Sequence, residues 1–551
     1  MLRSLFALSS LASVLVLLAG CDGAVAPSDG GSPADAGGAL VGDAGTEPPD
    51  AGPTTLTVPT ASGPVIGKRE GELLVFRRIP FAAPPTGERR FGPPAPVEPW
   101  TRPLDATGSG SVCLSRPIFG NAPAGREDCL HVNVWTPSIE GTRPVMVWVH
   151  GGAFETGSGS DALTEPSRLA REGGVVVVAI NYRLGIFGSL AHPSLAGEGE
   201  PNGNWGVLDQ QAALRWVRDN AAHFGGDPGN VTVFGHSAGG MSTCLLAISP
   251  GASGLAHRFI DQSGPCVIAL RSLDLAFDLG GRVASALQCK GDDAAACLRA
   301  KDGVAVLNAL SLPQQPGGML YQEVGLPHRP TLDGVTFVEP PLESLRAGRI
   351  ADASYVLGAA TDEGTMFHHG LLARPVMDAA QMREALGRIV DLVALEPAQI
   401  DAIAARYPVQ SYPSANDAIT RATTDMFVCA MRHMARLTQA AGRPTYLYHF
   451  AQEPDRVAVD GLGVYHGADL IFLFGNESVI GGTPGSAPEL GPLMRGYWSR
   501  FAASGLPAGS PVWPEWSPQS DMRLHLAQAV TLEAGDPDDE CDFWEGLLAS
   551  L

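Results

Sequence analysis

The chain has 551 residues, of which 45% are hydrophobic and 17% are charged, proportions that are ordinary for a soluble globular protein. Its 37 Lys and Arg residues stand against 58 Asp and Glu residues, which gives a formal net charge of -21. Because nucleic-acid binding requires a basic face, this balance argues against nucleic acid as a partner and indicates a solvated acidic surface.

The first segment has the features of an export signal. Residues 1–20, MLRSLFALSSLASVLVLLAG, carry one basic residue, Arg3, followed by an apolar run that is too short and too weakly flanked for a membrane-spanning helix. The segment ends in LLAGC, which resembles a bacterial lipobox, a small-residue cleavage site directly before a cysteine that receives lipid. We therefore expect an exported protein, either anchored to a membrane only through a lipid on Cys21 or extracellular, with ordinary secretion and an unmodified Cys21 as the alternative.

The signal is followed by a segment with a biased composition. Residues 21–53 are rich in Gly, Pro, Ala, Ser and Asp and contain no basic or aromatic side chain. Such a segment buries too little apolar surface to offset the entropy lost on ordering, so we predict a flexible tether. The folded domain is expected at residues 54–551.

Within this domain, short apolar runs alternate with longer amphipathic segments. Residues 143–152 (RPVMVWVHGG) and 173–183 (GGVVVVAINYR) are continuous apolar stretches bounded by turn residues, which predicts two buried strands. Residues 208–226 have apolar side chains on one helical face and end at a glycine pair, which predicts a helix. A strand at 230–236 then leads into another helix. This order predicts an α/β fold with a central, mostly parallel sheet flanked by helices.

The sequence GHSAG places Ser237 between glycines at the junction of that strand and helix. A turn tight enough to lift Ser237 clear of the sheet brings the flanking backbones so close that side chains at Gly235 and Gly239 would clash. The motif alone is a weak signal, but the apolar strand before it and the helix-compatible segment 240–249 after it strengthen it. We predict that Ser237 is a nucleophile and that the side chain of the adjacent His236 points away from it. The base that takes the proton of Ser237 must then come from another part of the chain.

A second glycine-rich turn supplies hydrogen-bond donors for the same site. The sequence HGGAF, which begins at His150, leaves the predicted strand 143–152. The backbone N–H groups of Gly151 and Gly152 can turn toward the pocket that receives the N–H of Ala238, and together they can stabilise the oxyanion of an acyl transfer. His150 is expected to anchor the loop rather than to act as a base.

At this point the residues resemble one family, the type-B carboxylesterases, the branch of the α/β-hydrolases that includes the cholinesterases. The resemblance extends from about Thr57 to Leu551. It rests on an ordered series of blocks: FRRIPFAAPPTGERRFGPPAP, EDCLHVNVWTP, NYRLGIFG, GNWGVLDQQAALRWVRDNAAHFGGDPGNVTVFGHSAGG, IDQSG, PTLDG, TDEGTMF, HGADLIFLFG and CDFWEGLL. It implies an α/β-hydrolase fold and the hydrolysis of small to medium carboxylic esters by a Ser-His-Glu triad through an acyl-enzyme.

The resemblance also implies the site residues. Ser237 matches the nucleophile, Glu363 in TDEGTMF the triad acid, and His466 in YHGADL the base. The chain order Ser, acid, His is that of the α/β-hydrolases. Asp362, one residue away, is the alternative acid, and Ser263 in DQSG is a candidate hydrogen-bond partner near the acid.

Nine cysteines are an odd number, and the lipobox accounts for one of them. The export signal favours disulfides in the mature protein. By similarity to the family we expect three disulfides, which join Cys113 to Cys129, Cys289 to Cys297 and Cys429 to Cys541. Cys244 and Cys266 remain, either as a fourth bridge or as two buried thiols. No cluster has metal-ligand spacing, so we expect no metal and no cofactor.

The chain departs from the family near the nucleophile. Family members usually carry Glu where this chain has His236, and cholinesterases place a tryptophan in the first disulfide loop, whereas residues 113–129 contain Phe119 and no tryptophan. Without an anionic partner and an aromatic platform for a quaternary ammonium group, choline esters are poor substrates. The short loop also limits any large interfacial lid, which favours small esters over long-chain lipids. Ala153 replaces a common glycine, which could tighten the pocket on the alcohol side.

Several side chains are candidates for the wall of the substrate pocket: Phe154, Phe187, Trp205, His236, Phe367 and His368. Aromatic side chains of this kind are more often core residues, so hydrophobic packing is the alternative for each. Two further hypotheses compete with the esterase. One is a non-catalytic, cholinesterase-like surface binding protein, against which the intact Ser237, Glu363 and His466 argue. The other is an amidase or lipase with the same triad.

Overall fold

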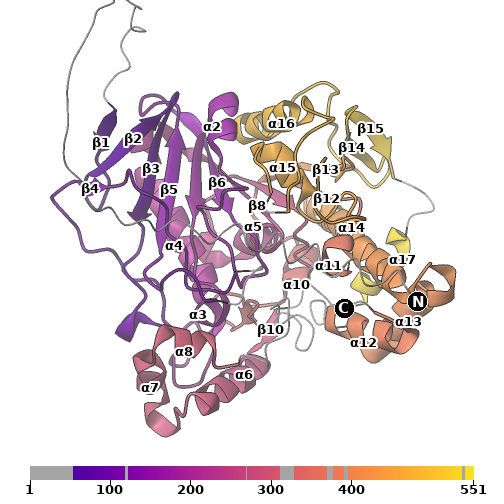
Figure 1. The fold of residues 1–551 in the computed structure, drawn as a ribbon, viewed down its shortest axis with the longest axis horizontal. Coiled ribbons are helices and arrows are strands. Elements are labelled where there is room, and N and C mark those ends of the chain that lie inside the picture. The colour runs from indigo at the N-terminus through magenta and orange to yellow at the C-terminus, as the bar shows by residue number, and fades with distance from the viewer. Residues whose placement is uncertain are drawn as a thin grey trace, which may run out of the picture. The chain divides into compact units, whose positions relative to one another are not determined.

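The structure, a computed structural model, describes residues 54–117, 122–267, 270–310, 328–368, 376–389, 395–478, 480–535 and 540–550. The predicted signal, the lipid attachment at Cys21, the tether and Phe119 lie outside these residues. Figure 1 shows the arrangement of the helices and strands.

The strands are β1 (Thr55–Val58), β2 (Val65–Glu70), β3 (Leu73–Pro80), β4 (Leu104–Asp105), β5 (His131–Thr136), β6 (Arg143–Val149), β7 (Val176–Ile180), β8 (Gly226–His236), β9 (Arg258–Gln262), β10 (Arg271–Ser272), β11 (Thr331–Leu332), β12 (Ser354–Ala360), β13 (Thr445–Phe450), β14 (Met522–Leu526) and β15 (Thr531–Ala534). The helices are α2 (Ser167–Gly173), α3 (Gly185–Ser189), α4 (Trp205–Asn220), α5 (Ala238–Ile248), α6 (Leu273–Ala286), α7 (Ala294–Ala300), α8 (Gly303–Leu307), α10 (Pro341–Arg346), α11 (Thr365–His368), α12 (Ala379–Ile389), α13 (Pro397–Arg406), α14 (Ala415–Ala440), α15 (Ala468–Phe474), α16 (Leu490–Ser504) and α17 (Cys541–Ala549).

A large twisted sheet forms the centre of the domain. Its order is β1-β2-β3-β5-β7-β6-β8-β9-β12-β13-β14-β15, with β4 paired to β2. The strands from β7 to β14 along this order pair in parallel, whereas β1, β2, β3, β5 and β15 pair antiparallel with their neighbours in this order. The predicted mostly parallel α/β sheet is thus confirmed. Because parallel strands end at the same edge, the turns after β6, β8 and β12 lie close together.

The two faces of the sheet carry separate hydrophobic cores, and strand β6 shows why. Val145, Val147 and Val149 pack into one core with helices α4, α5 and α14, while Met146 and Trp148 pack into the other with α2, α15 and α16. Successive side chains of a strand point to opposite faces, so a continuous apolar run is what a strand covered on both sides requires. In the described part of the chain, no helix is both long and apolar enough to cross a membrane.

Helix α4 differs from the one-sided amphipathic helix that the sequence predicts. Its buried residues include Asp209 and Gln210 as well as the apolar side chains. Asp209 is tolerated there because Arg183 donates two hydrogen bonds to its carboxylate, each 2.7 Å long. A buried carboxylate that is paired in this way avoids the desolvation cost of an isolated charge.

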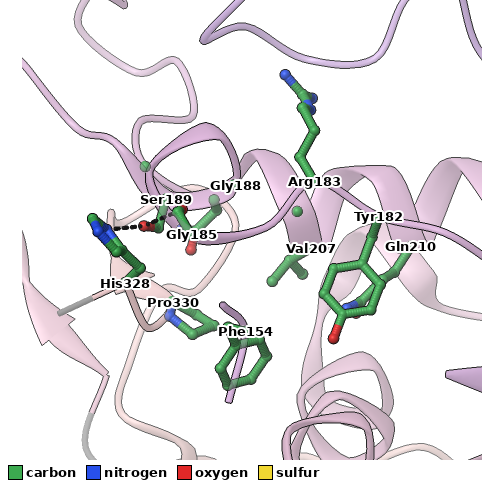
Figure 2. A pocket seen from close by; sticks show the side chains of 13 residues that line it. Phe154, Tyr182, Arg183, Gly185, Gly188, Ser189, Val207, Gln210, His328 and Pro330 are labelled. Carbon is green, nitrogen blue, oxygen red and sulfur yellow. Dashed lines mark hydrogen bonds between the residues drawn. The ribbon is translucent and has the colours of Figure 1, made fainter. Parts of the chain in front are cut away.

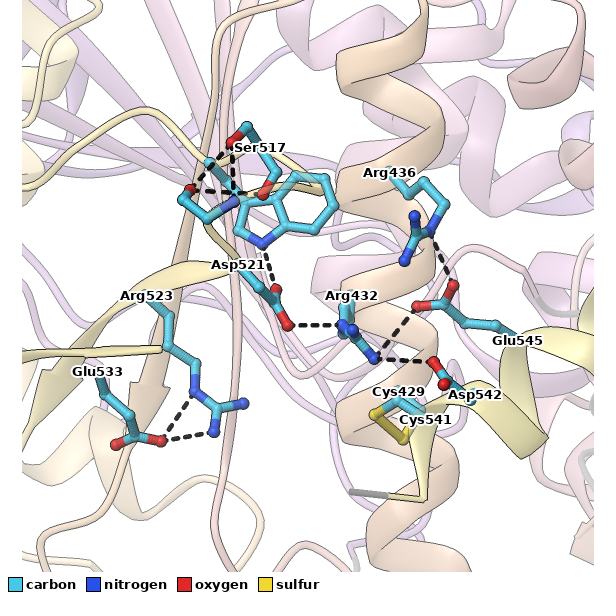
Figure 3. A network of polar contacts seen from close by, with 12 residues as sticks. Cys429, Arg432, Arg436, Ser517, Asp521, Arg523, Glu533, Cys541, Asp542 and Glu545 are labelled. Carbon is cyan, nitrogen blue, oxygen red and sulfur yellow. Dashed lines mark hydrogen bonds and ion pairs between the residues drawn. A yellow bond between two sulfur atoms is a disulfide. The ribbon is translucent and has the colours of Figure 1, made fainter. Parts of the chain in front are cut away.

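Disulfides join Cys113 to Cys129, Cys289 to Cys297 and Cys429 to Cys541, which are the three pairs expected from the resemblance. Cys244 and Cys266, whose state the sequence left open, form a fourth bridge. The Cys429–Cys541 bond attaches α17 to α14, beside a group of ion pairs (Figure 3).

Candidate active site

Ser237 occupies the sharp turn between β8 and α5. Its backbone has φ 58° and ψ -125°, a left-handed conformation that strains a residue with a side chain. The neighbouring glycines allow the turn: a Cβ atom on Gly239 would lie 2.0 Å from the carbonyl oxygen of Val149, and one on Gly235 would lie 2.4 Å from that of Gly239. The predicted close approach of the flanking backbones is therefore present.

Glu363 and His466 are brought together from two other turns of the sheet edge. Nδ1 of His466 lies 2.5 Å from Oε2 of Glu363, which has no exposed surface. The other carboxylate oxygen, Oε1, accepts hydrogen bonds from the Ser263 hydroxyl at 2.6 Å and the Ala360 backbone N–H at 2.7 Å. These bonds hold the carboxylate in one orientation, and the contact of Ser263 is the one expected from the sequence.

Asp362, the alternative acid, has a different role in the structure. Its Oδ2 atom accepts a 2.8 Å hydrogen bond from the backbone N–H of Val464, and Asp362 forms an isolated bridge with Tyr465. Asp362 therefore fixes the backbone that leads into His466, whereas Glu363 contacts the imidazole itself.

The remaining ring nitrogen of His466, Nε2, is buried and has no hydrogen-bond partner among the described residues. A buried nitrogen in this state carries a cost that structures usually avoid, unless a reacting group occupies the position during function. The geometry leaves Nε2 available to accept a proton.

The glycine turn after β6 lies directly against the nucleophile. A Cβ atom on Gly151 would lie 3.2 Å from the Cβ of Ser237. No described residue accepts a backbone hydrogen bond from the N–H of Gly151, Gly152 or Ala238. Free N–H groups at the start of α5 and in the adjacent turn are the donors that an oxyanion site needs.

His236 lies closer to the predicted base than the sequence suggests. The sequence predicts only that its side chain points away from Ser237, but its ring centroid is 4.4 Å from that of His466. His236 is buried, and Nε2 has no hydrogen-bond partner in the described parts of the chain. Burial, together with the nearby His466, lowers the pKa of His236 well below its usual value, so the ring is neutral near pH 7.

Two phenylalanines flank the ring of His466. The Phe367 and Phe427 centroids lie 5.1 Å and 5.2 Å from the His466 centroid, and the two phenylalanine rings stack at 5.7 Å. The sequence predicts Phe367 for the pocket wall but gives no indication of Phe427. Phe427 lies on the long helix α14, where an aromatic residue at helical spacing has the same pattern as a core residue.

A small pocket adjoins the turn after β6, and Figure 2 shows its wall. Of the predicted substrate-pocket residues, only Phe154 lines it, and Ser237, Glu363 and His466 do not. Phe154 has φ 62° and its carbonyl oxygen accepts a 2.6 Å hydrogen bond from the Gly185 N–H. The pocket therefore borders the glycine turn rather than the reacting groups.

Three other candidates have packing or hydrogen-bond partners elsewhere in the described structure. Trp205 is fully buried in a core cluster and donates its indole N–H to the Leu190 carbonyl oxygen, and Phe187 belongs to the same cluster. His368 is buried, with Nε2 3.0 Å from the Thr423 hydroxyl on α14. Packing thus explains these side chains, as the alternative interpretation allowed.

His150 anchors the glycine turn, as the sequence predicts. Its ring stacks on Tyr182 at 4.4 Å, and Nδ1 lies 2.9 Å from the carbonyl oxygen of Gly151. Burial lowers the pKa of His150 to about 4, so the ring is neutral at pH 7.

Known proteins share the sequence pattern and the architecture of this chain. Residues 54–544 match the pattern described as the carboxylesterase family. The chain is 33% identical over 504 residues to para-nitrobenzyl esterase of Bacillus subtilis, and the alignment covers 88% of this chain and 98% of that protein. It is 33% identical over 540 residues to carboxylesterase 1D of Mus musculus, covering 89% and 93% of the two chains. A solved structure of a PNB esterase superposes with a TM-score of 0.76 at 31% identity, over 89% of this chain and 99% of that one.

Proposed function

Because the chain belongs to the carboxylesterase family, we propose that Ser237, His466 and Glu363 carry out its ester hydrolysis as nucleophile, base and acid. The chain is a carboxylic-ester hydrolase with the α/β-hydrolase fold of the PNB esterase structure. One observation carries the assignment of the residues: His466 is held through Nδ1 by a fully buried carboxylate, while its Nε2 has no hydrogen-bond partner among the described residues.

The reaction follows from these positions. As the Ser237 hydroxyl attacks the ester carbonyl carbon, Nε2 of His466 takes its proton, and the same nitrogen then gives the proton to the departing alcohol. Water hydrolyses the resulting acyl-enzyme by the reverse sequence of proton transfers. Glu363 keeps the Nδ1 proton of His466 in place and stabilises the imidazolium that forms between these transfers.

The oxyanion of the tetrahedral intermediate is bound by the backbone N–H groups of Gly151, Gly152 and Ala238. Their lack of other acceptors in the described structure supports this role. Losing one such donor typically reduces the rate by roughly 10²- to 10³-fold.

The surroundings of His466 favour neutral esters with hydrocarbon groups. The rings beside it are Phe367, Phe427 and the neutral His236. An apolar, uncharged wall of this kind attracts a hydrocarbon acyl or alcohol group and gives no ion pair to a cationic ester. Because no ion pair is offered, neutral esters are expected to be preferred over choline esters.

The test is a comparison of ester and amide cleavage by the purified protein and its Ser237→Ala variant. The substrates are p-nitrophenyl esters of graded acyl length and the matching p-nitroanilides. We expect turnover of the esters, with kcat reduced by roughly 10⁴- to 10⁶-fold in Ser237→Ala. Equal rates for the two proteins would contradict the proposed nucleophile, and cleavage of the anilides alone would identify an amidase.

We also propose that the protein is exported and that Cys21 receives a lipid. Four disulfides support export, because such bonds persist in oxidising compartments. Replacing Cys21 with Ser should move the enzyme from the membrane fraction to the soluble exported fraction. If the variant and the unchanged protein distribute equally, Cys21 carries no anchoring lipid.

A further inference from the structure

Three potential metal ligands meet outside the active site, at the end of the sheet formed by β13, β14 and β15. They are His449, His525 and Glu533, and one ligand atom from each lies within 4.8 Å of the others. No spacing in the sequence indicates this cluster, because its members come from separate strands.

The strand register explains why these side chains share one face. His449 and His525 are direct partners in the parallel β13–β14 pair, and His525 faces Thr531 in the antiparallel β14–β15 pair. Glu533 lies two residues after Thr531, so its side chain projects from the same face. Residues on neighbouring strands at this register can approach within side-chain contact.

The ligand atoms themselves face one another. Nδ1 of His525 lies 2.5 Å from Oε2 of Glu533, and Nδ1 of His449 lies 3.5 Å from Oε1. Both Nδ1 atoms are buried, and each is paired with an oxygen atom of the Glu533 carboxylate. Two imidazole nitrogens and a carboxylate thus share one small space, with their ligand atoms directed at one another.

The groups around the cluster orient it. Nε2 of His449 lies 3.0 Å from the Thr361 hydroxyl, which fixes the ring and leaves Nδ1 directed at Glu533. Arg523 donates to Oε1 of Glu533 through Nε at 2.9 Å, as Figure 3 shows, and leaves Oε2 without a bond to the guanidinium. Partners of this kind position metal-binding imidazoles and carboxylates in known sites.

We propose that His449, His525 and Glu533 form a zinc-binding site that is separate from ester hydrolysis. Two imidazoles and one carboxylate are a ligand set that Zn²⁺ accepts, with water as the fourth ligand. Zinc–nitrogen bonds of about 2.0–2.1 Å place tetrahedral ligands about 3.4 Å apart, and in the structure the two Nδ1 atoms lie 3.5 Å and 2.5 Å from the Glu533 oxygens. The positive charge of Arg523 opposes the ion, so the affinity is below that of a site without this charge.

The bound ion would connect the edge strand β15 to β13 and β14. β15 is a short strand with exposed and half-exposed side chains. In the described structure, β14 is the only strand that pairs with it. Zinc is therefore expected to stabilise the fold against heat while leaving ester turnover unchanged.

The test uses the full chain, freed of metal by dialysis, and Zn²⁺ alone as the probe. Competition with a chromophoric chelator measures the affinity, and Co²⁺ in place of Zn²⁺ reports the geometry through its visible absorption. The variants are His525→Ala and Glu533→Gln, and the matched control is His223→Ala, which removes an exposed histidine elsewhere. Ester turnover of each variant checks that it is folded.

We expect about one Zn²⁺ per chain, the intense absorption of a tetrahedral Co²⁺ complex, and a melting temperature that rises with zinc. His525→Ala and Glu533→Gln should each weaken zinc binding by about tenfold or more and remove the melting shift, by analogy with the loss of ligand-orienting groups in metal sites. His223→Ala should change neither. Equal zinc affinity in the unchanged protein and in an active His525→Ala variant would overturn the proposal, as would a Co²⁺ complex with only weak, octahedral absorption.

Discussion

The active-site edge of the sheet and the contact between α14 and α17 both gather ionisable side chains from distant parts of the sequence, but they leave those groups in different states. At the active site, the Nε2 atoms of His466 and His236 are buried without hydrogen-bond partners in the described structure. At the α14–α17 contact, Arg432 lies 3.0 Å from Asp521 and 3.7 Å from Glu545 (Figure 3).

The difference separates groups that react from groups that stabilise. Arg436 also pairs with Glu545 at 2.8 Å, and Asp521 accepts a hydrogen bond from the Trp516 indole at 2.7 Å. Each charge at this contact thus meets an opposite charge or a donor, which satisfies it and leaves nothing for a substrate. Buried ionisable residues alone do not identify a catalytic site; a buried ring nitrogen without a partner, next to a strained serine, is more specific.

The largest expected effect concerns the active site, where Glu363 contacts His466. Glu363→Gln removes the charge that stabilises protonated His466 but keeps a side chain of the same shape. We expect kcat to fall by roughly 10³- to 10⁴-fold, as for removal of a triad carboxylate charge in general, with little change in melting temperature. Rates on a p-nitrophenyl ester measure the effect.

Asp362→Asn is the matched control for this variant. Its side-chain oxygen can still accept the bond from the Val464 N–H, so kcat should fall far less than in Glu363→Gln. A larger loss in Asp362→Asn would reverse the assignment of the acid.

The next prediction tests the contact between α14 and α17, where the charged groups stabilise the fold. The Cys429–Cys541 bond closes a loop with a sequence separation of 112 residues, so its removal releases a large part of the unfolded chain. Replacing both cysteines with Ala should lower the free energy of unfolding by about 2–4 kcal/mol, measured by denaturant titration. Because these cysteines lie beside ion pairs rather than reacting groups, kcat should be unchanged. If the double cysteine variant had normal stability but a reduced kcat, the α14–α17 contact would serve catalysis rather than stability.

A smaller effect is expected at Ser263, which touches the acid but not the substrate. Its hydroxyl donates a 2.6 Å hydrogen bond to Oε1 of Glu363. Ser263→Ala leaves the bond from the Ala360 N–H in place, so we expect kcat to fall by about tenfold, within the usual range for a hydrogen bond between buried polar groups. Ser263→Cys, which keeps a weak donor without adding a branched side chain at this positive-φ position, should recover part of the rate. Failure of this rescue in a folded variant would show that Ser263 acts through packing.

The parts of the active site that the sequence predicts are those with a local pattern or a family resemblance. The turn at Ser237 and the glycine turn at Gly151 are local: glycines are required wherever backbones approach closely, and the strand and helix around them have clear patterns. The resemblance to a family supplied Glu363 and His466, which no periodicity reveals because they lie on separate turns.

Other features depend on tertiary packing and have no local signal. Phe427 looks like any core residue of α14, and Trp205 looks like a pocket residue until its burial is known. The contact of His236 with His466 depends on where the turn at Gly467 passes: a Cβ atom on Gly467 would lie 3.2 Å from Cε1 of His236. No spacing in the sequence encodes that distance.

The smallest expected effect concerns His236 and is a shift in pH dependence. Its ring is neutral near pH 7 because its pKa lies well below the usual value, so it supplies no charge to His466. A carboxylate in its place would favour the protonated form of His466, because opposite charges attract. Since the base must be neutral to accept the proton of Ser237, activity should then be lost at a higher pH as the solution is acidified.

We therefore expect the acid limb of kcat/KM in His236→Glu to move to higher pH by about one unit, which corresponds to about 1.4 kcal/mol of interaction between the two side chains. His236→Gln, which is uncharged, is the matched control and should leave the limb in place. A limb that moves equally in both variants would show that packing rather than charge connects the two rings. If either variant were folded but as inactive as Ser237→Ala, His236 itself would be the base, and His466 would hold only a supporting position.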